Sequence, residues 1–389
     1  MDDRAYVQRG TESPWYQGWD LTDEERATFR ATTLAAQEAK RKALRGEAEG
    51  PRHPINYPRL DPLELMPLEP KHGLRALSLF SGGGGLDIGF DRAGYQHVAS
   101  YELLSSAAAA ISKARPEWTV FGGDAGDVTR VDWAAWRNKV DVLHGGPPCQ
   151  PFSHAVRRKG AGDARDMIPA LVKAVREIRP QAFVCENVSG LITKRFEPYI
   201  QSTIYAPLAG EYHLQQFCLE AADFGVPQRR KRVFFVGFRD KAAWKNFRPP
   251  AATHTQTPAV GNDLAPTMGA RAALGLPEIG VDGLAPTLRS GFTGPRFTTS
   301  VLSSVSAQKI WSSLQIWPNG VSPTRDQASA YPTKNGHFRL SVPDCLVLQG
   351  FPGDWPVGTT VYVALGLIGN SVAPPMGYRL AQAVRQALN

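Results

Sequence analysis

The sequence has few cysteines, no long apolar run and no signal-peptide pattern, and each absence excludes a class of protein. The 389 residues contain four cysteines, at positions 149, 185, 218 and 345. These have neither the paired spacing of a zinc site nor the density of a disulfide framework, so we expect reduced thiols and no metal. No apolar run approaches the roughly 20 residues of a membrane span. The start, Met1-Asp2-Asp3-Arg4, lacks the basic and then apolar pattern of a secretory leader, so we expect a cytoplasmic protein without a membrane partner.

The length and the charge of the chain further restrict the class of protein and its possible partners. A hydrophobic content of 42% and a charged content of 21% are ordinary for a globular protein. A chain of 389 residues can bury a large core and is long enough for two domains. The net charge of +8 favours a polyanion such as nucleic acid as a partner, although solubility alone would also explain a moderate excess.

The first 70 residues are predicted to be an extension of the main body. Thr22 and Glu25 form a capping box, the following Arg26–Leu44 segment is rich in helix formers, and Gly46 is the predicted stop. The repeated prolines after it predict a linker, or a strap that lies on the main body. Nothing in this extension indicates a function.

The main body begins with a predicted strand, a glycine loop and a helix. Leu74–Phe80 has a short apolar strand pattern, Ser81–Gly85 is nearly all glycine, and Leu86–Ala93 has a helical pattern. Glycines without Cβ let a ligand approach the backbone, and such loops bind dinucleotides, phosphates or S-adenosylmethionine. Tight glycine turns without a ligand are also common. The missing Walker lysine argues against a triphosphate.

Carboxylates follow the next two predicted strands. Glu102 comes directly after His97–Tyr101, where a Rossmann-like fold places the acid that binds ribose hydroxyls. Asp124 follows Thr119–Phe121 and is a candidate acceptor for an adenine amino group. A solvated surface carboxylate is the alternative for each. Because these positions stand at successive strand ends, they predict a single crevice.

A proline-rich loop follows the fourth predicted strand, Asp141–Leu143. Residues 145–153 read Gly-Gly-Pro-Pro-Cys-Gln-Pro-Phe-Ser, and the prolines fix φ and remove backbone donors, which predicts an ordered loop leaving a strand end. Cys149 on this loop is a candidate nucleophile, although a buried structural cysteine is the commoner fate of this residue type. Ala182–Cys185 is the predicted fifth strand, and Glu186 at its end is a candidate acid beside Cys149.

In this order, the glycine loop, Pro-Pro-Cys-Gln and Glu186-Asn187-Val188 resemble the cytosine-5 DNA methyltransferases of bacterial restriction-modification systems. Three later segments resemble the family's basic, ninth and last motifs: Gln228-Arg229-Arg230-Lys231-Arg232, Leu348-Gln349-Gly350-Phe351-Pro352 and Gly369-Asn370-Ser371-Val372. The resemblance spans residues 74–389. It implies an α/β fold, with a Rossmann-like S-adenosylmethionine-dependent large domain and a smaller, mostly β target-recognition domain.

The resemblance also divides the chain. Residues 1–70 are the extension, 71–238 the catalytic and cofactor-binding domain, 239–362 the small target-recognition domain, and 363–389 a return that completes the catalytic domain. The stretch from Arg239 to about Gly336 is rich in Gly, Pro, Ser and Thr with short strand-like runs. That composition is typical of the family's recognition domain.

The resemblance implies a mechanism with named residues. Cys149 would add to carbon 6 of cytosine, which activates carbon 5 toward the methyl group of S-adenosylmethionine, and Glu186 would hydrogen-bond the base. Arg230 and Arg232 match the family's basic pair, with Arg232 expected at the base. The cytosine must leave the duplex, and the segment after Ser153 is the expected lid. The expected cofactor-binding residues are Phe80, Gly82, Gly84, Glu102, Asp124, Pro148, Asn370 and Ser371. The expected DNA-contacting residues are Ser153, His154, Arg157, Arg158, Lys159, Thr287, Arg289 and Arg296.

The implied partner is double-stranded DNA, bound by a monomer at the bacterial nucleoid, with a cognate restriction endonuclease that acts on the same site without a stable complex. An RNA-directed cytosine-5 methyltransferase is the alternative enzyme, and the recognition region of roughly 100 residues argues against it. A catalytically silent DNA-binding relative is the alternative from another class. A methyltransferase acting on exocyclic nitrogen would need Asp, Asn or Ser where Gly146 stands, and a thiol hydrolase would need a histidine oriented toward Cys149.

Overall fold

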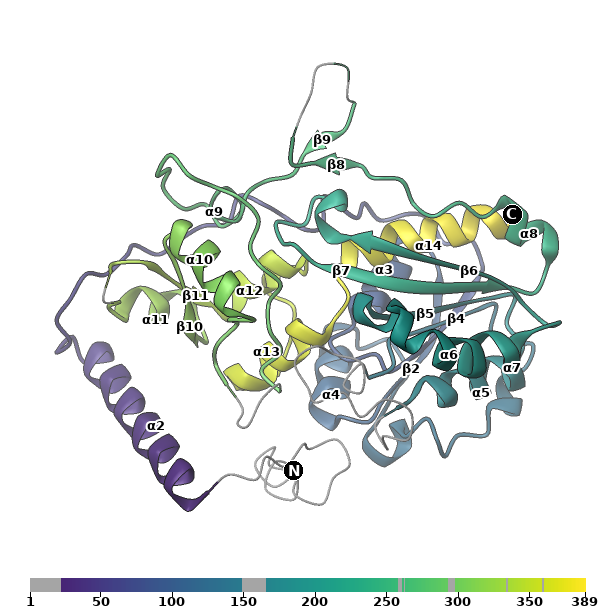
Figure 1. Ribbon diagram of the computed structural model, residues 1–389, viewed down its shortest axis with the longest axis horizontal. Coiled ribbons are helices and arrows are strands. Elements are labelled where there is room, and N and C mark those ends of the chain that lie inside the picture. The colour runs from purple at the N-terminus through teal and green to yellow at the C-terminus, as the bar shows by residue number, and fades with distance from the viewer. Residues whose placement is uncertain are drawn as a thin grey trace.

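The computed structural model describes residues 22–148, 166–257, 261, 263–292, 298–333, 335–358 and 360–389. A seven-stranded sheet lies at the centre of the larger part of the molecule (Figure 1). Its strands are β1 (Arg75–Leu79), β2 (Gln96–Glu102), β3 (Val120–Gly122), β4 (Val142–Gly145), β5 (Ala182–Val188), β6 (His213–Glu220) and β7 (Lys231–Phe238).

The order across the sheet is β3-β2-β1-β4-β5-β7-β6. The first five strands in this order are parallel, and β7 runs antiparallel to both β5 and β6. The chain moves outward in one direction from β1 and in the other from β4, so the strand order reverses between these two neighbours. Ligands of open α/β sheets bind at the carboxyl ends of the strands beside such a reversal.

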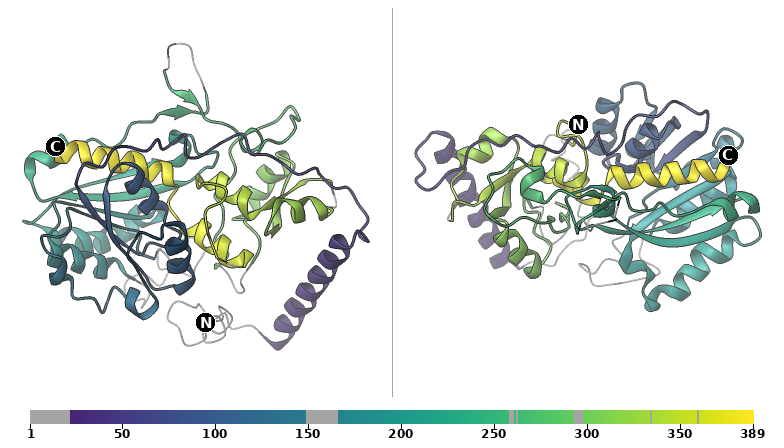
Figure 2. Two further views of the ribbon diagram at one scale, coloured as in Figure 1. Left: turned by 180° about the vertical axis from the view of Figure 1, so that it is seen from behind. Right: turned by 90° about the horizontal axis from the view of Figure 1, so that it is seen from above.

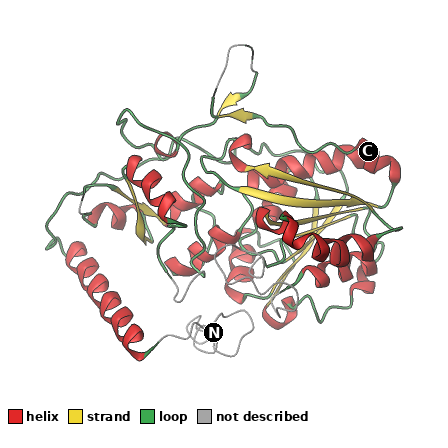
Figure 3. Cartoon of the chain, viewed as in Figure 1, coloured by secondary structure: helices red, strands yellow, loops and turns green. Residues whose placement is uncertain are grey.

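Helices cover both faces of the sheet because strand side chains alternate in direction (Figure 3). Leu77 and Leu79 of β1 pack with α5 (Ile168–Ile178) on one face. Ala76, whose side chain points in the opposite direction, packs with α3 (Gly85–Arg92) and α14 (Pro374–Leu388) on the other face. The remaining helices of this part are α4 (Ser105–Ala114), α6 (Glu197–Ile200), α7 (Ala206–Leu208) and α8 (Lys241–Asn246).

The small part of the molecule is built from short elements. Its strands are β8 (His254–Thr255), β9 (Ala265–Pro266), β10 (Ile316–Ser322) and β11 (Phe338–Ser341), and its helices are α9 (Ala270–Ala273), α10 (Val305–Ser313), α11 (Arg325–Ala330) and α12 (Val342–Gln349). The next helix, α13 (Val361–Asn370), leads back to the glycine loop of the large part. The expectation of a mostly β small domain is therefore wrong for the described residues, because helices are at least as prominent as strands. Two side-chain caps explain part of the difference: Ser304 caps α10, and Ser341 with Asp344 forms a capping box on α12.

The extension forms a helix and a strap. The predicted helix is confirmed as α2 (Asp23–Leu44), with both capping-box bonds between Thr22 and Glu25 and with Gly46 at φ 77° beyond its end. In Figures 1 and 2, α2 lies outside the small part of the molecule, and the strap after it crosses to the large part. Among the described residues, no helix is both long and apolar enough to cross a membrane.

Candidate active site

The glycine loop after β1 is bent by residues in the left-handed backbone region. Phe80 has a φ of 56°, Gly82 of 54° and Gly84 of 82°. Such a backbone conformation costs a non-glycine residue roughly 1–3 kcal/mol and is concentrated at functional sites. A Cβ added at Gly82 would meet only the Phe80 carbonyl oxygen, at 3.9 Å. One side of the loop is therefore open to a ligand.

The other side of the glycine loop packs against the turn between α13 and α14. A Cβ on Gly83 would lie 2.6 Å from Ser371 Oγ, and a Cβ on Gly85 would lie 2.2 Å from the Val372 carbonyl oxygen. Ser371 is buried, whereas its neighbour Asn370 at the end of α13 is exposed. The first and the last predicted cofactor segments therefore lie side by side, as the sequence motifs imply.

The two predicted nucleoside-binding carboxylates stand at the same end of the sheet. Glu102 accepts hydrogen bonds at 2.7 Å from the backbone amides of Gly82 and Leu104. Burial raises the pKa of Glu102 above its ordinary value, and these two bonds oppose the shift. Glu102 is paired in register with Gly122 of β3, and Asp124, just beyond, is exposed. Glu102 therefore contacts the glycine loop directly, and Asp124 follows the neighbouring strand at the same end of the sheet.

The loop that leaves β4 rests on β5. The Asn187 side chain donates a hydrogen bond of 3.2 Å to the Pro147 carbonyl oxygen, which fixes the loop next to the end of β5. A Cβ added at Gly146 would lie 2.8 Å from Glu186 Oε2, so only glycine leaves room for that carboxylate. Pro148 is half-buried and is the last described residue before the cysteine.

Glu186 and Arg232 form a buried ion pair at the carboxyl end of β5. Arg232 Nε lies 2.8 Å from Glu186 Oε1. Glu186 pairs in register with Phe234, and Val188 with Arg232, so the two charged residues are diagonal neighbours on one face of the antiparallel pair. Burial raises the pKa of Glu186, and the positive charges of Arg232 and Arg230 oppose the shift. The carboxyl group is thus held in place and pushed toward its protonated form.

The side chain of Arg230 has different partners from that of Arg232, although the two residues are only two positions apart. Its side chain is fully buried and donates to the carbonyl oxygens of Gly369 at 2.9 Å and Ser371 at 2.6 Å. These carbonyls are at the carboxyl-terminal end of α13, where a positive charge is favourable. Arg230 therefore fixes the segment that packs on the glycine loop, and it is not beside Glu186 in the way that Arg232 is.

Two buried glutamines that the sequence did not single out join these segments. Gln228 donates to the Leu348 carbonyl oxygen at 3.0 Å and to Gln349 Oε1 at 2.8 Å, and it accepts from the Leu288 amide at 3.1 Å. Gln349 in turn donates to the Ser371 carbonyl oxygen at 2.8 Å. Both belong to motifs quoted above. A polar residue at a motif position that is buried was the feature of the sequence that could have revealed them.

Trp355 is a third residue that the sequence did not reveal. It is 5% exposed and its Nε1 donates a hydrogen bond of 3.0 Å to the Gly83 carbonyl oxygen. The Arg115 guanidinium lies 5.2 Å from the centre of its ring. The indole thus closes one flank of the glycine loop from the segment between α12 and α13.

The described DNA-contact candidates lie beside the basic motif. Thr287 Oγ1 donates to the Arg229 carbonyl oxygen at 2.6 Å, and the Arg289 amide donates to the Val301 carbonyl oxygen at 3.0 Å. Burial lowers the pKa of Arg289 from its ordinary value. Seven other predicted site residues lie outside the described residues: Cys149, Ser153, His154, Arg157, Arg158, Lys159 and Arg296.

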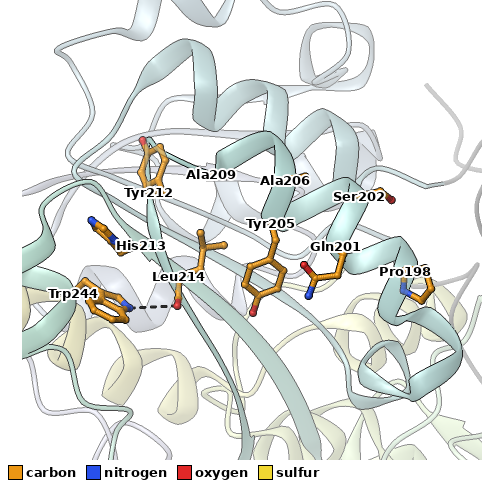
Figure 4. Close-up of a pocket in the computed structure, with 10 residues that line it drawn as sticks. All are labelled: Pro198, Gln201, Ser202, Tyr205, Ala206, Ala209, Tyr212, His213, Leu214 and Trp244. Carbon is orange, nitrogen blue, oxygen red and sulfur yellow. Dashed lines mark hydrogen bonds between the residues drawn. The ribbon is translucent and has the colours of Figure 1, made fainter.

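A hollow of about 690 Å³ lies on another part of the large domain (Figure 4). Tyr205, Tyr212, His213 and Trp244 are among the residues that line it. His213 belongs to the edge strand β6 and pairs with the end of β7 that is opposite Ala182, the first residue of β5. The hollow is therefore at the amino end of β5, away from Glu186.

The strand order, the open glycine loop and the buried Glu186–Arg232 pair describe a nucleotide-type crevice that includes a buried acid. The C-5 cytosine-specific DNA methylase family matches residues 74–272, which hold β1 to β9. The chain belongs to this family. It is a DNA (cytosine-5-)-methyltransferase, as the sequence motifs predict.

Curated relatives of this methylase cover most of the chain. Type II methyltransferase M.NgoMIV of Neisseria gonorrhoeae is 31% identical over 317 residues, which is 80% of this chain and 97% of that protein. Type II methyltransferase M.NaeI of Lentzea aerocolonigenes is 30% identical over 323 residues, which is 81% of this chain and 76% of that protein.

Solved structures agree with the fold of the methylase. The S. pombe Dnmt2 methyltransferase has a TM-score of 0.54 at 16% identity, over 82% of this chain and 99% of that one. The Entamoeba histolytica methyltransferase EhMeth has a TM-score of 0.52 at 18% identity, over 82% of this chain and 100% of that one. The predicted Rossmann-like large domain is thereby confirmed.

Proposed function

We propose that this methyltransferase transfers a methyl group from S-adenosylmethionine to carbon 5 of a cytosine that is flipped out of a specific site in duplex DNA. The observation that carries the proposal is the buried Glu186–Arg232 pair, which stands beside Gly146 on the loop that leads to Cys149. A buried acid at this position suits a hydrogen bond to a neutral base, because a protonated carboxyl can donate to cytosine N3.

The cofactor residues fit a nucleoside with a positively charged sulfur. The open face at Gly82, the carboxylate of Glu102 and the exposed Asp124 offer close backbone approach, acceptors for ribose hydroxyls and an acceptor for an adenine amino group. Phe80, Gly84, Pro148, Asn370 and Ser371 complete the proposed binding site. When bound, S-adenosylmethionine supplies an electrophilic methyl group.

Cys149 and Glu186 act on the base. The Cys149 thiolate forms a bond to carbon 6, and the electron pair of the 5,6 double bond makes carbon 5 nucleophilic. Glu186 donates a proton or hydrogen bond to N3 as negative charge develops there, and Arg232 holds the Glu186 carboxyl group in position. After methylation, carbon 5 loses its proton to a base and the sulfur–carbon 6 bond breaks, which restores both the aromatic ring and the thiolate. Arg230 is a positioning residue in this proposal.

DNA recognition is assigned to the remaining predicted parts. The base must leave the stack to reach a thiol, and the segment after Ser153, with His154, Arg157, Arg158 and Lys159, is the proposed lid. Residues 239–362, including Thr287, Arg289 and Arg296, are the proposed recognition domain, between catalytic segments 71–238 and 363–389. The names of the Type II relatives support a role in the bacterial cytoplasm as the modification enzyme of a restriction-modification system, with a monomer acting beside a cognate endonuclease.

The test is methyl transfer followed by trapping of the adduct. Purified protein with labelled S-adenosylmethionine should label mixed-sequence duplex DNA, and bisulfite sequencing should find one modified site sequence. In that site, 5-fluorocytosine cannot release a proton from carbon 5, so wild type and Cys218→Ala should form a stable adduct and Cys149→Ala should not. Cys218 is a free, partly buried cysteine on β6 and serves as the matched control. Label in transfer RNA but not in DNA would instead support the RNA-directed alternative.

A further inference from the structure

The strap, residues 47–72, has no part in the site above. The family match begins at residue 74, and the strap precedes it, between α2 and β1. All of its residues are described, and they form neither helix nor strand. A segment without secondary structure must bond its buried polar groups to other segments. The partners of these groups therefore show which parts of the molecule the strap connects.

The Asn56 side chain bonds the first half of the strap to the small part. Asn56 is 6% exposed, and its side-chain amide donates to the Leu274 carbonyl oxygen and to Asp344 Oδ1, each at 3.0 Å. Asp344 is fully buried in the first turn of α12, where Arg325 also donates to it at 3.0 Å. A buried polar group that loses its partner is costly. Asn56 therefore fixes the strap against α12 and against the residue that follows α9.

The backbone of the strap also lies directly on the small part. The amides of Arg59 and Leu60 donate to the Ala273 carbonyl oxygen at 3.0 and 3.2 Å. Gly275 follows α9 with a φ of 68°, and a Cβ on it would lie 1.9 Å from the Tyr57 carbonyl oxygen. Only glycine lets the two backbones approach this closely. The first half of the strap is thus held on the turn after α9 as far as Leu60.

The second half of the strap is bonded to the large part. The Glu69 carboxylate contacts Gln382 and Arg385 of α14. The Glu69 amide donates to the carbonyl oxygen of Arg92, the last residue of α3, at 2.8 Å. Met66 is fully buried in the core to which α3 and α14 contribute. These contacts join the strap to the helices that cover one face of the central sheet.

The span between the two sets of contacts is short and consists of residues 61–65. Backbone hydrogen bonds fold this span into a turn, including one of 3.1 Å from the Glu64 amide to the Asp61 carbonyl oxygen. Five residues reach at most about 18 Å even when fully extended. The chain also passes between the two parts after α8 and after α12. The strap adds a further connection, and its short span limits how far the two parts can separate.

The two parts meet beside the basic motif. The Arg229 amide donates to the Ala285 carbonyl oxygen, and the Ala285 amide donates to the Pro227 carbonyl oxygen, each at 2.9 Å. Arg229 stands three residues before Arg232, which binds Glu186. A shift of the small part against the large part would therefore break bonds next to the proposed site of the base.

Two simpler roles compete with a role in DNA binding. A strap that covers the crevice would contact the open side of the glycine loop, whereas the contacts given above for the large part are with α3 and α14. A strap that only stabilises the fold would lower the melting temperature when it is loosened, and the affinity of the folded protein for each ligand would not change. The first role does not fit the contacts, and the second makes a different prediction.

We propose that the strap is a brace that holds the small part in a fixed position against the large part, and so preforms the surface on which duplex DNA docks. The inference rests on the proposed function, since it takes the small part as the recognition domain. Apparent affinity falls with the fraction of molecules in the binding-competent arrangement, and a surface that is fixed before binding loses less entropy on binding. Asn56 is a positioning residue of this brace.

The brace should act on DNA binding and leave cofactor binding unchanged. The proposed cofactor residues lie on the large part and on the turn after α13. Arg230 of the large part binds that turn directly, through the carbonyl oxygens of Gly369 and Ser371. The cofactor site is therefore held together without the strap.

The experiment lengthens the span and keeps every contact of the strap. About ten Gly and Ser residues are inserted between Leu60 and Asp61, and a flexible insert of this length covers roughly 18 Å on average. Longer surface loops cost little stability. The control has the same insert between Glu49 and Gly50, where the chain on both sides contacts the small part. The control therefore lengthens no connection between the two parts.

The span insertion should bind a duplex that contains the methylation site about tenfold more weakly than the control insertion, with an equal rise in the KM for DNA. The kcat at saturating DNA and the affinity for S-adenosylmethionine should match those of the control. Equal DNA affinity in the two insertions would overturn the proposal. So would an equal loss of affinity for the cofactor, because the insertion would then have damaged the large part.

Hydrogen exchange tests the brace without DNA. The Arg229 and Ala285 amides bond across the contact between the two parts, so they exchange when the parts separate. In the span insertion they should exchange about tenfold faster than in the control. Unchanged exchange would contradict the brace. If wild type neither binds nor methylates DNA, the proposed function fails, and this exchange then decides on the brace alone.

A side-chain variant tests Asn56 as the positioning residue. Asn56→Ala should weaken DNA binding about fivefold, whereas Ile55→Ala, at a neighbouring side chain that is 39% exposed, should match wild type. In the span insertion, Asn56→Ala should add little, because the brace is already slack. Losses that add in full would mean that Asn56 acts independently of the brace, and the proposal would be wrong. Circular dichroism checks folding, and if the span insertion is unfolded, Asn56→Ala decides through DNA affinity and hydrogen exchange.

Discussion

The two sides of the crevice hold their groups by different means. On the side proposed for the base, Glu186 and Arg232 are ionisable side chains that contact each other inside the protein. On the side proposed for the cofactor, Glu102 is held by backbone amides and the glycine loop by an indole. Changes on the base side should therefore slow the reaction itself, and changes on the cofactor side should weaken binding with a smaller effect on the rate.

The largest expected effect comes from Glu186→Gln. The amide cannot protonate N3, so kcat should fall by about 10²–10³ while the KM for S-adenosylmethionine changes little. In wild type, activity that needs the protonated carboxyl is lost as the pH rises through the raised pKa of Glu186. The residual activity of the variant should not show this fall at high pH. Glu211→Gln, at an ion pair of 3.7 Å with Arg179, is the control. An unchanged kcat would mean that another group stabilises the base.

Gly146→Ala tests the base side without changing a charged group. The new Cβ would lie 2.8 Å from Glu186 Oε2, so the carboxylate must move away from the position in which Arg232 holds it. We expect kcat to fall about ten- to a hundredfold, which is roughly 1.4–2.7 kcal/mol of transition-state stabilisation. Gly283→Ala is the matched control because its Cβ would meet nothing within 4 Å. Equal rates in the two variants would show that the position of Glu186 is not critical.

Local sequence patterns predicted those residues of the crevice whose positions follow from the order of the strands. Glu102 and Glu186 each follow a short apolar run, and parallel strands bring their carboxyl ends to one side of the sheet. The α2 helix was also predictable, because Thr22 and Glu25 are three residues apart and cap it locally. Such predictions need only neighbours in the sequence.

The parts that escaped prediction depend on distant contacts. Arg230 and Arg232 look alike in the basic motif, yet Arg230 binds carbonyls at the carboxyl-terminal end of α13 and Arg232 binds Glu186. Asn56 meets Asp344 across most of the chain. In the small part, short helices form between glycines and prolines because their caps and tertiary packing outweigh weak local preference. Only a three-dimensional arrangement assigns these side chains their partners.

Trp355→Phe tests the cofactor side. Phenylalanine fills most of the same volume and removes the hydrogen bond to the Gly83 carbonyl oxygen, which costs about 1 kcal/mol and should weaken binding of S-adenosylmethionine about fivefold. The kcat at saturating cofactor and the affinity for DNA should stay near wild type. Calorimetric titration measures the change, with Trp136→Phe as the control, because that indole donates to the Tyr101 hydroxyl at 3.1 Å on the same domain. A fall in kcat without weaker binding of S-adenosylmethionine would mean that Trp355 acts on the reaction at the base and not on cofactor binding.

The smallest expected effect on activity comes from a histidine that lies between the two sides, because its change acts on stability. His144 in β4 precedes the Gly146 loop, and its buried ring stacks on Phe90 of α3 at 4.2 Å. Burial lowers the pKa of His144 to about 3, so the folded protein loses stability as the pH falls below the unfolded value of about 6.5. Between pH 7 and pH 5 the loss is about 2 kcal/mol. His144→Phe removes the ionisable ring, so its free energy of unfolding, measured by denaturant titration at pH 7 and at pH 5, should depend less on pH than that of wild type. An unchanged pH dependence in this variant would mean that His144 is not the group that takes up a proton on unfolding.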